Sequence, residues 1–216
     1  MTASKGHVTQ TQAARIPRLY EGSTLRHIEP GGEMGVGRSG YNALHRWSER
    51  HPWFLDRGVG LLLWGDNGVG KTYAGCALLR LMITQCVPCL YITAPELKQE
   101  LVRPTPWADG QTLGQRARTV SVLLLDDLGK EYSKDGGFGF AELAFENLMR
   151  ARAGAMLTTL VTMNLSLDAF AERYARSALS LAQEVFVPVQ LKGPDKRKAL
   201  AKRNKEMLCG QTNGGD

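Results

Sequence analysis

The sequence predicts an α/β fold in which parallel strands alternate with helices. Short apolar runs that fit buried strands are separated along the chain by longer segments in which apolar residues recur at helical spacing. A glycine-rich loop stands between the first of these strands and the next helix. Such alternation is typical of strand–helix–strand units, in which helical crossovers connect parallel strands of one sheet.

The predicted strands are short and mostly apolar, as expected for strands that are covered on both faces. They lie at 60–64, 89–93, 120–125, 157–162 and 185–189. The predicted helices lie at 41–50, 71–85 and 140–152, and residues 167–181 predict one or two helices. A short helix should open at Pro95, and residues 113–118 should be partly helical. The residue before a proline avoids helical backbone angles, so Pro52 should end the first helix.

The length of 216 residues suits one domain with short flanking segments. Residues 1–40 are rich in glycine and polar side chains and predict a flexible arm, residues 41–191 a folded domain, and residues 192–216 a basic tail. Hydrophobic residues make up 43% of the chain, which excludes wholesale disorder. The formal net charge of +6 is compatible with a polyanionic partner such as nucleic acid.

Neither secretion nor membrane insertion is predicted. Residues 1–12 are polar, and the longest apolar runs are much shorter than a bilayer-spanning helix. The four cysteines do not suggest a disulfide framework, which suits a reducing compartment. A cytoplasmic protein without a membrane partner is therefore expected.

The glycine-rich loop predicts a site for a nucleoside triphosphate with Mg²⁺, and ATP is the expected nucleotide. Its sequence, Gly-Asp-Asn-Gly-Val-Gly-Lys-Thr at 65–72, fits the pattern G-x-x-x-x-G-K-[ST] of a phosphate-binding loop, or P-loop. Glycines let the backbone N–H groups face phosphate oxygens, and the next helix adds its positive N-terminus. In this pattern Lys71 reaches the β- and γ-phosphates, and Thr72 places its hydroxyl on Mg²⁺. The predicted nucleotide-binding residues are Gly65, Asp66, Asn67, Gly68, Val69, Gly70, Lys71, Thr72 and Tyr73.

Polar residues follow two other predicted strands. Ligands of open α/β sheets bind at the carboxyl ends of the strands, where the P-loop also lies. Asp126 therefore fits a Mg²⁺ ligand acting through water, and Asp127 fits the group that orients or deprotonates the attacking water. Asn164 fits either a contact to that water or the γ-phosphate, or the N-cap of the next helix.

These motifs resemble the AAA+ ATPases, and among them the DnaC/DnaI branch of replicative-helicase loaders and the related IstB-like transposition helpers. The resemblance covers residues 41–197. It rests on the P-loop, on Leu-Leu-Leu-Asp-Asp-Leu-Gly-Lys-Glu at 123–131, on Val-Thr-Met-Asn-Leu at 161–165 and on Gly-Pro-Asp-Lys-Arg at 193–197. It implies a parallel five-stranded sheet flanked by helices, ATP and Mg²⁺ as cofactors, and a sensor role for Asn164.

The resemblance also implies an ATPase that works on DNA. Its implied partners are DNA (single-stranded above all), a replicative helicase or another replication or transposition protein, and further copies of the chain. Members of the family assemble so that an arginine of one copy reaches the ATP of the next, usually from a Ser-Arg-Leu setting. Here Ser180 is followed by Leu181, and Arg176 is the candidate, with Arg173 nearby. The arm is also shorter than the helicase-binding domain of loaders, so the resemblance does not identify the partner.

The tail is dense in basic residues but lacks aromatic side chains. Phosphate contacts from such residues would give salt-sensitive, sequence-independent DNA binding without base readout. The same residues also fit a solvated tail that aids solubility. The candidates for nucleic-acid contact are Lys192, Lys196, Arg197, Lys198, Lys202 and Arg203.

Three functions fit these features. The first is a helicase loader, or its mobile-element equivalent, whose ATP hydrolysis is weak until the protein assembles or meets DNA. The second is a transposition helper ATPase that oligomerises on DNA. The third is a nucleotide-gated adaptor with little hydrolysis, which the missing Ser-Arg-Leu arginine supports.

Overall fold

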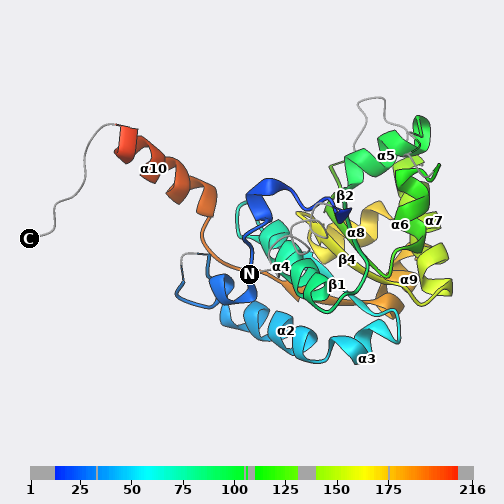
Figure 1. The fold of residues 1–216 in the computed structure, drawn as a ribbon, viewed down its shortest axis with the longest axis horizontal. Coiled ribbons are helices and arrows are strands. Elements are labelled where there is room, and N and C mark those ends of the chain that lie inside the picture. The colour runs from blue at the N-terminus through cyan, green and yellow to red at the C-terminus, as the bar shows by residue number, and fades with distance from the viewer. Residues whose placement is uncertain are drawn as a thin grey trace, which may run out of the picture.

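A parallel sheet of five strands forms the centre of the computed structural model, which describes residues 13–32, 34–104, 106, 110–130, 140–174 and 176–208 (Figure 1). The strands are β1 (Gly60–Trp64), β2 (Cys89–Thr93), β3 (Val122–Leu128), β4 (Thr158–Met163) and β5 (Phe186–Gln190). They pair in the order β2-β3-β4-β1-β5, and every pairing is parallel. The predicted α/β fold with a parallel five-stranded sheet is confirmed. Strand β3 extends three residues beyond its predicted end and so includes both acidic residues.

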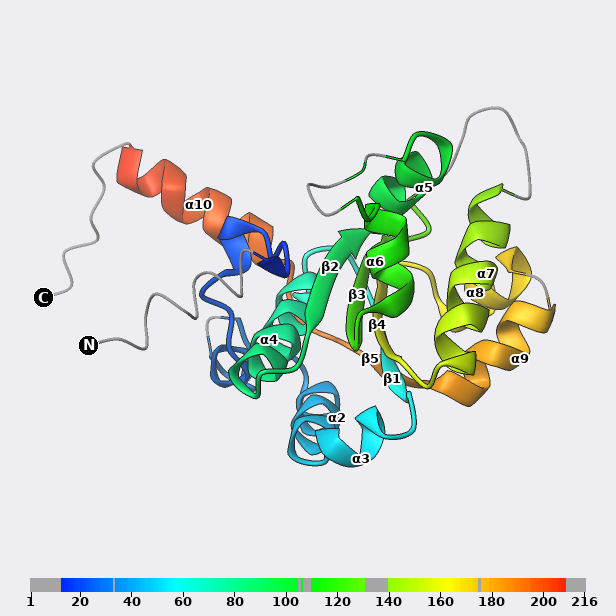
Figure 2. The same ribbon diagram turned by 45° about the vertical axis from the view of Figure 1, so that its right-hand side comes forward.

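Helices cover both faces of the sheet (Figure 2). Leu61 and Leu63 of β1 point into one half of the core, which holds α2 (Arg38–Glu49) and α4 (Lys71–Thr84). Leu62 points into the other half. That second layer consists of α5 (Ala94–Val102), α6 (Leu113–Thr119), α7 (Phe140–Gly154), α8 (Leu167–Arg173) and α9 (Arg176–Val185). Successive side chains of a strand point to opposite faces of the sheet, and helices cover both faces. The strand sequences are therefore mostly apolar.

Local sequence signals explain several helix boundaries. Helix α2 ends at Glu49, and Pro52 lies in the first turn of the short helix α3 (His51–Leu55), as its missing N–H permits. At α5 the hydroxyl of Thr93 accepts the N–H of Glu96, while the Glu96 carboxylate accepts the N–H of Thr93. This reciprocal capping box starts the helix at the predicted place.

The segment before α2 packs against the domain. It contains two short 3₁₀ helices, η1 (Arg18–Tyr20) and η2 (Leu25–Ile28). Four of its apolar residues are buried in the core that contains α4: Ala14, Ile16, Ile28 and Val36. Residues 13–32 and 34–37 of the predicted arm thus contribute apolar side chains to the core, although these side chains have no periodic spacing in the sequence. Residues 1–12 lie outside the described ranges.

Both edges of the sheet are protected. At the β2 edge the carbonyl of Ala14 accepts the N–H of Tyr91 at 2.8 Å. At the β5 edge Pro188 lies within the strand and has no N–H to offer. These two features limit the hydrogen-bonding groups that the edge strands present to solvent.

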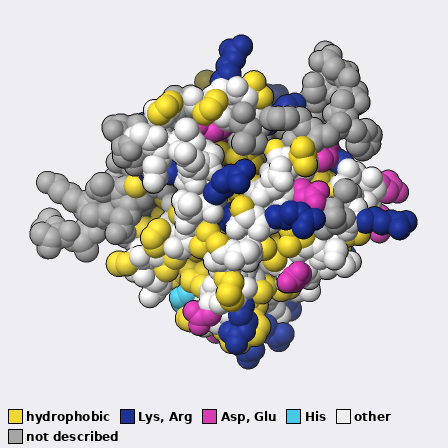
Figure 3. Space-filling view, turned by 90° about the vertical axis from the view of Figure 1, so that its right-hand side faces the viewer, with side chains coloured by type: hydrophobic (Ala, Val, Ile, Leu, Met, Phe, Trp, Pro, Cys, Tyr) yellow, Lys and Arg dark blue, Asp and Glu magenta, His cyan; other side chains and the backbone are white. Residues whose placement is uncertain are grey.

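Helix α10 (Lys196–Leu208) projects away from the domain, and most of its side chains are exposed (Figures 1 and 2). It forms much of the predicted basic tail, and residues 209–216 lie outside the described ranges. The face of the domain on the side away from α10 mixes basic, acidic and hydrophobic side chains (Figure 3). None of the helices in the described ranges has the length and apolarity needed to cross a bilayer.

A buried arginine connects α7 with the starts of two strands. Arg152 is 1% exposed, and its guanidinium donates to the carbonyls of Ala117, Val120 and Thr158 at 2.7, 2.9 and 2.6 Å. It also donates to the Thr159 hydroxyl at 2.8 Å. Burial lowers the pKa of Arg152 to about 9, so the side chain stays charged at neutral pH. The arginine thus satisfies backbone carbonyls at the end of α6 and beside β3 and β4.

We expect the substitution Arg152→Met to lower the free energy of unfolding by about 3 kcal/mol, because it leaves buried carbonyls without donors. Urea denaturation followed by circular dichroism measures the change. The control is Arg150→Met, which removes an exposed arginine of the same helix that pairs with Glu146 and should cost less than about 1 kcal/mol. Equal effects of the two substitutions would contradict the role given to Arg152.

Candidate functional site

The predicted P-loop joins β1 to α4, as its pattern requires. Gly65, Gly68 and Gly70 have positive φ angles of 143°, 76° and 101°, which glycine adopts without strain. Val69 is 1% exposed and anchors the loop in the core. The loop and the first turn of α4 line a cavity of about 360 Å³ through Asn67, Gly68, Gly70, Lys71, Thr72 and Tyr73.

The chain after β5 crosses the P-loop closely. A Cβ at Gly65 would lie 2.2 Å from the carbonyl oxygen of Leu191, and one at Gly68 would lie 1.8 Å from Oδ1 of Asp195. The N–H of Lys196 donates to the Gly68 carbonyl at 3.1 Å. The segment Gly-Pro-Asp-Lys-Arg at 193–197, which was singled out in the sequence, therefore packs directly on the loop.

Lys71 folds back over the loop. Its Nζ donates to the carbonyls of Gly65 and Asp66, each at 2.7 Å. The residue is 7% exposed. Burial lowers the pKa of Lys71, and the negative charge of Asp127 opposes this shift. The P-loop lysine is thus a partly desolvated cation at the wall of the cavity.

Asp126 is a buried carboxylate surrounded by hydroxyl groups. It is 3% exposed and accepts hydrogen bonds from Thr72 at 2.9 Å, from Tyr91 at 2.8 Å and from Thr162. Burial raises the pKa of Asp126, and the hydroxyl donors oppose this shift. Oxygen ligands of this kind suit Mg²⁺, so the Thr72 hydroxyl and the Asp126 carboxylate, which already touch, form a fitting pair for that ion.

Asp127 lies at an irregularity of β3. The register with β4 shifts between Leu125 and Leu128, and Asp127 has a φ angle of 61°. Its N–H donates to the Thr162 hydroxyl at 3.0 Å, and its Oδ2 lies 2.8 Å from Nζ of Lys130. The irregularity separates the two carboxylates, because Asp126 is buried in the sheet whereas Asp127 lines the cavity.

The strand ends converge as the sequence predicted. Asn164 follows β4 and lines the same cavity as Lys71, Thr72 and Asp127. Sequence reasoning did not find other lining residues from the segment before α2, namely Leu19, Tyr20 and Met34. No spacing rule could have found these, since Leu19 and Tyr20 lie in the short 3₁₀ helix η1 and Met34 lies in a turn. Tyr91 and Thr162 were also missed, although hydroxyls within apolar strands beside an acidic strand end are a visible signal.

The two candidate arginines differ in their surroundings. Arg173 donates to the Gly129 carbonyl at 2.9 Å and to Glu142 at 3.1 Å, so it holds the turn after β3. Arg176 is exposed at the start of α9 and does not line the cavity.

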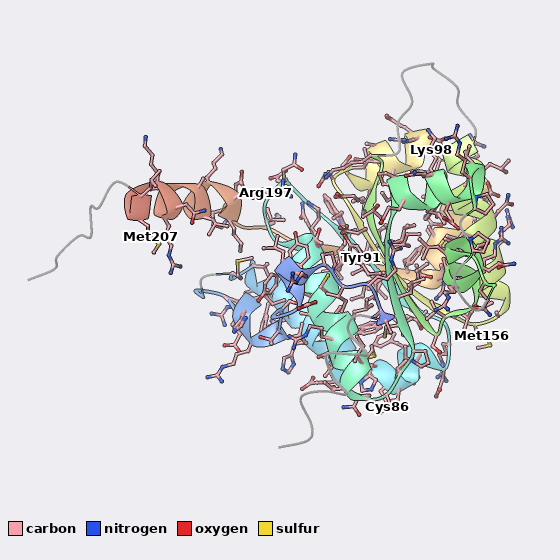
Figure 4. All side chains as sticks on the ribbon, turned by 45° about the horizontal axis from the view of Figure 1, so that its top comes forward. Cys86, Tyr91, Lys98, Met156, Arg197 and Met207 are labelled. Carbon is pink, nitrogen blue, oxygen red and sulfur yellow. The ribbon has the colours of Figure 1, made fainter. Side chains whose placement is uncertain are left out.

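The basic candidates of the tail divide into three groups. Lys196 was predicted to contact nucleic acid, and this prediction is wrong because the residue is buried. It is 9% exposed, and its Nζ donates to the Gly35 carbonyl at 2.7 Å. Arg197, which lies at the root of α10 (Figure 4), and Arg203 are exposed and line the cavity beside the P-loop. The remaining members of the predicted set are exposed and do not line the cavity, and they are Lys192, Lys198 and Lys202.

Comparison with curated proteins gives two informative relatives, although no protein-family model matches the chain. The predicted ATP-binding protein of insertion sequence IS1162 from Pseudomonas fluorescens is 43% identical over 70 residues, or 32% of this chain and 30% of that protein. The replicative helicase loader DnaI of Bacillus subtilis is 26% identical over 160 residues, covering 65% of this chain and 48% of the loader. The chain thus spans less than half the length of either relative.

Several solved structures share the architecture. The DnaI crystal structure has a TM-score of 0.66 at 24% identity, covering 84% of this chain and 94% of that one. The DnaC helicase loader gives 0.65 at 20% identity, with 82% and 100% covered. The replication initiator DnaA bound to AMPPCP and single-stranded DNA gives 0.62 at 16% identity, with 89% and 56% covered. The chain therefore shares its fold with these solved structures.

Proposed function

We propose that the chain binds ATP with Mg²⁺ in the cavity beside the P-loop and hydrolyses it while acting in DNA replication, as a helicase loader or its mobile-element equivalent. One observation carries the proposal: Lys71, Asp127 and Asn164 line a single cavity, and Thr72 touches Asp126 at its edge. A cation, separated carboxylates and a hydroxyl are the groups that a phosphoryl-transfer site uses.

The role of each residue follows from its contacts. Phosphate oxygens would replace the carbonyls of Gly65 and Asp66 as partners of the Lys71 ammonium, with the N-terminus of α4 beside them. Thr72 and Asp126 would hold Mg²⁺, which when bound neutralises charge on the phosphate oxygens. Asp127 faces the cavity and would orient the attacking water and take its proton. Asn164 would hold the same water or the γ-phosphate.

The site is completed in this proposal by a second copy of the chain. Within one copy Arg173 is engaged by Gly129 and Glu142. Arg176 is exposed and would reach the nucleotide of a neighbour, where a positive charge stabilises the transferring phosphoryl group. Hydrolysis would then be slow for isolated molecules and faster in assemblies.

DNA is the proposed polyanionic partner. The exposed lysines of the tail, Lys192, Lys198 and Lys202, would contact phosphates rather than bases.

The likeness to the loader DnaI over 65% of the chain supports a role in helicase loading. The 43% identity to the insertion-sequence protein favours a second candidate, a transposition helper ATPase that oligomerises on DNA. Filaments on duplex DNA would distinguish it from a loader, which would form a complex with a ring helicase.

The substitution Lys71→Ala should weaken ATP binding about 10- to 100-fold, because charge-assisted hydrogen bonds to phosphate are lost. Titration of a fluorescent ATP analogue measures the dissociation constant. Lys98→Ala, which removes a lysine of α5, is the control and should bind as the unmodified chain does (Figure 4). Unchanged affinity of Lys71→Ala would refute the P-loop assignment.

The substitution Asp127→Asn should leave ATP binding nearly unchanged and lower the turnover rate by about 100-fold or more, as expected for loss of a general base. Asparagine tolerates the positive φ angle at this position, so the backbone should persist. Phosphate release at saturating ATP measures the rate. Asp168→Asn, at an exposed carboxylate of α8, should keep full turnover. Normal turnover of Asp127→Asn would remove Asp127 from the catalytic role.

Turnover per molecule should rise cooperatively with protein concentration and increase further with single-stranded DNA. Arg176→Ala and Asp127→Asn should each be inactive alone, yet a mixture of the two should regain activity, since one copy supplies Arg176 and the other an intact Asp127. A mixture that stays inactive would refute action of Arg176 on a neighbour. A flat, near-zero rate despite tight ATP binding would instead identify a nucleotide-gated adaptor.

A further inference from the structure

The Asp126 carboxylate is held by more groups than the P-loop pattern supplies. Thr72 belongs to that pattern and donates to Oδ1 at 2.9 Å and lies 3.2 Å from Oδ2. Two further hydroxyls come from the neighbouring strands: Thr162 of β4 donates to Oδ1, and Tyr91 of β2 donates to Oδ2 at 2.8 Å. Each carboxylate oxygen therefore keeps one donor if the Thr72 bond is withdrawn.

We propose that Tyr91 is a positioning residue for the metal site: its hydroxyl, opposite that of Thr162, fixes the Asp126 carboxylate in the orientation that accepts Mg²⁺. The proposal rests on the proposed function, in which Thr72 and Asp126 hold that ion. Tyr91 itself touches neither nucleotide nor metal in this proposal, and it acts through Asp126 alone.

The sheet register explains why a residue of β2 reaches this far. Tyr91 pairs with Leu124, and Asp126 lies two residues farther along β3 on the same face. Diagonal neighbours of this kind are within reach of a long aromatic side chain. Tyr91 is 8% exposed and packs in the core half that contains α4, so its ring has little freedom (Figure 4).

The chemistry of the donors also fits a metal site. A carboxylate offers about four lone-pair positions, and a hydroxyl uses one of them without cancelling the charge. A lysine or arginine at the same place would neutralise Asp126 and compete with the cation. Tyr91 and Thr162 together compensate the burial of the carboxylate while its negative charge stays available.

Tyr91 is also held from its backbone. Its N–H donates to the Ala14 carbonyl at 2.8 Å, and the adjacent Arg15 forms an ion pair with Glu96 at 3.0 Å. The segment before α2 thus supports the strand position from which the hydroxyl reaches Asp126.

The test is the Mg²⁺ dependence of nucleotide binding. Tyr91→Phe removes one hydroxyl and keeps the ring, and it should raise the Mg²⁺ concentration for half-maximal binding of a fluorescent ATP analogue about 10-fold. Binding of the same analogue in EDTA should stay within about twofold of the unmodified chain, because the phosphate contacts of the P-loop are untouched. The control is Tyr41→Phe, which removes a tyrosine hydroxyl bonded to Glu29 away from the cavity.

A second pair of variants keeps the test independent of Tyr91. Thr162→Val should raise the Mg²⁺ requirement, whereas Thr162→Ser retains a hydroxyl and should restore the behaviour of the unmodified chain. A shift of less than about twofold for Tyr91→Phe would overturn the proposal, as would an equal loss of binding in EDTA, which indicates a general structural effect. If Mg²⁺ does not strengthen binding of the analogue to the unmodified chain, the metal site of the proposed function fails and the inference fails with it.

Discussion

A carboxylate that is buried at the end of a strand loses its hydration, and hydrogen bonds must compensate this loss. The Asp126 carboxylate receives these hydrogen bonds from hydroxyl groups alone. Three donors converge on it from α4, β2 and β4, so the P-loop helix and two strands are connected at one point. A basic partner would have satisfied the burial cost as well, but it would have removed the charge. Because the donors are neutral, Asp126 keeps its negative charge and can still attract a cation. The same hydrogen bonds connect the neighbouring strands and α4.

The rest of the cavity is built from segments that flank the sheet in sequence. Leu19, Tyr20 and Met34 form one wall, and Arg197 with Arg203 contributes to another. These walls are joined to each other, because Lys196 reaches the Gly35 carbonyl and the N–H of Gly37 donates to the Lys192 carbonyl at 2.7 Å. A nucleotide bound in this cavity would therefore contact the start of α10 as well as the strand ends.

The sequence predicted the parts of this structure that have a period or a fixed motif. The strands, the P-loop between β1 and α4, the short helix that opens at Pro95 and the convergence of Asp127 with Asn164 all follow from local rules. Burial of Ala14, Ile16, Ile28 and Val36 could not be predicted, since these residues have no periodic spacing. Burial of Lys196 could not be predicted either, because this lysine belongs to a basic run in the sequence. It is buried because the chain crosses closely over Gly68 in the folded structure.

The two protected sheet edges restrict how copies of the chain can meet. Continuation of one sheet into another needs a free row of N–H and carbonyl groups on an edge strand. Ala14 occupies part of that row on β2, and Pro188 interrupts it on β5. Contacts between copies of the chain would then use side chains of helices and loops, and they would not add strands to the sheet.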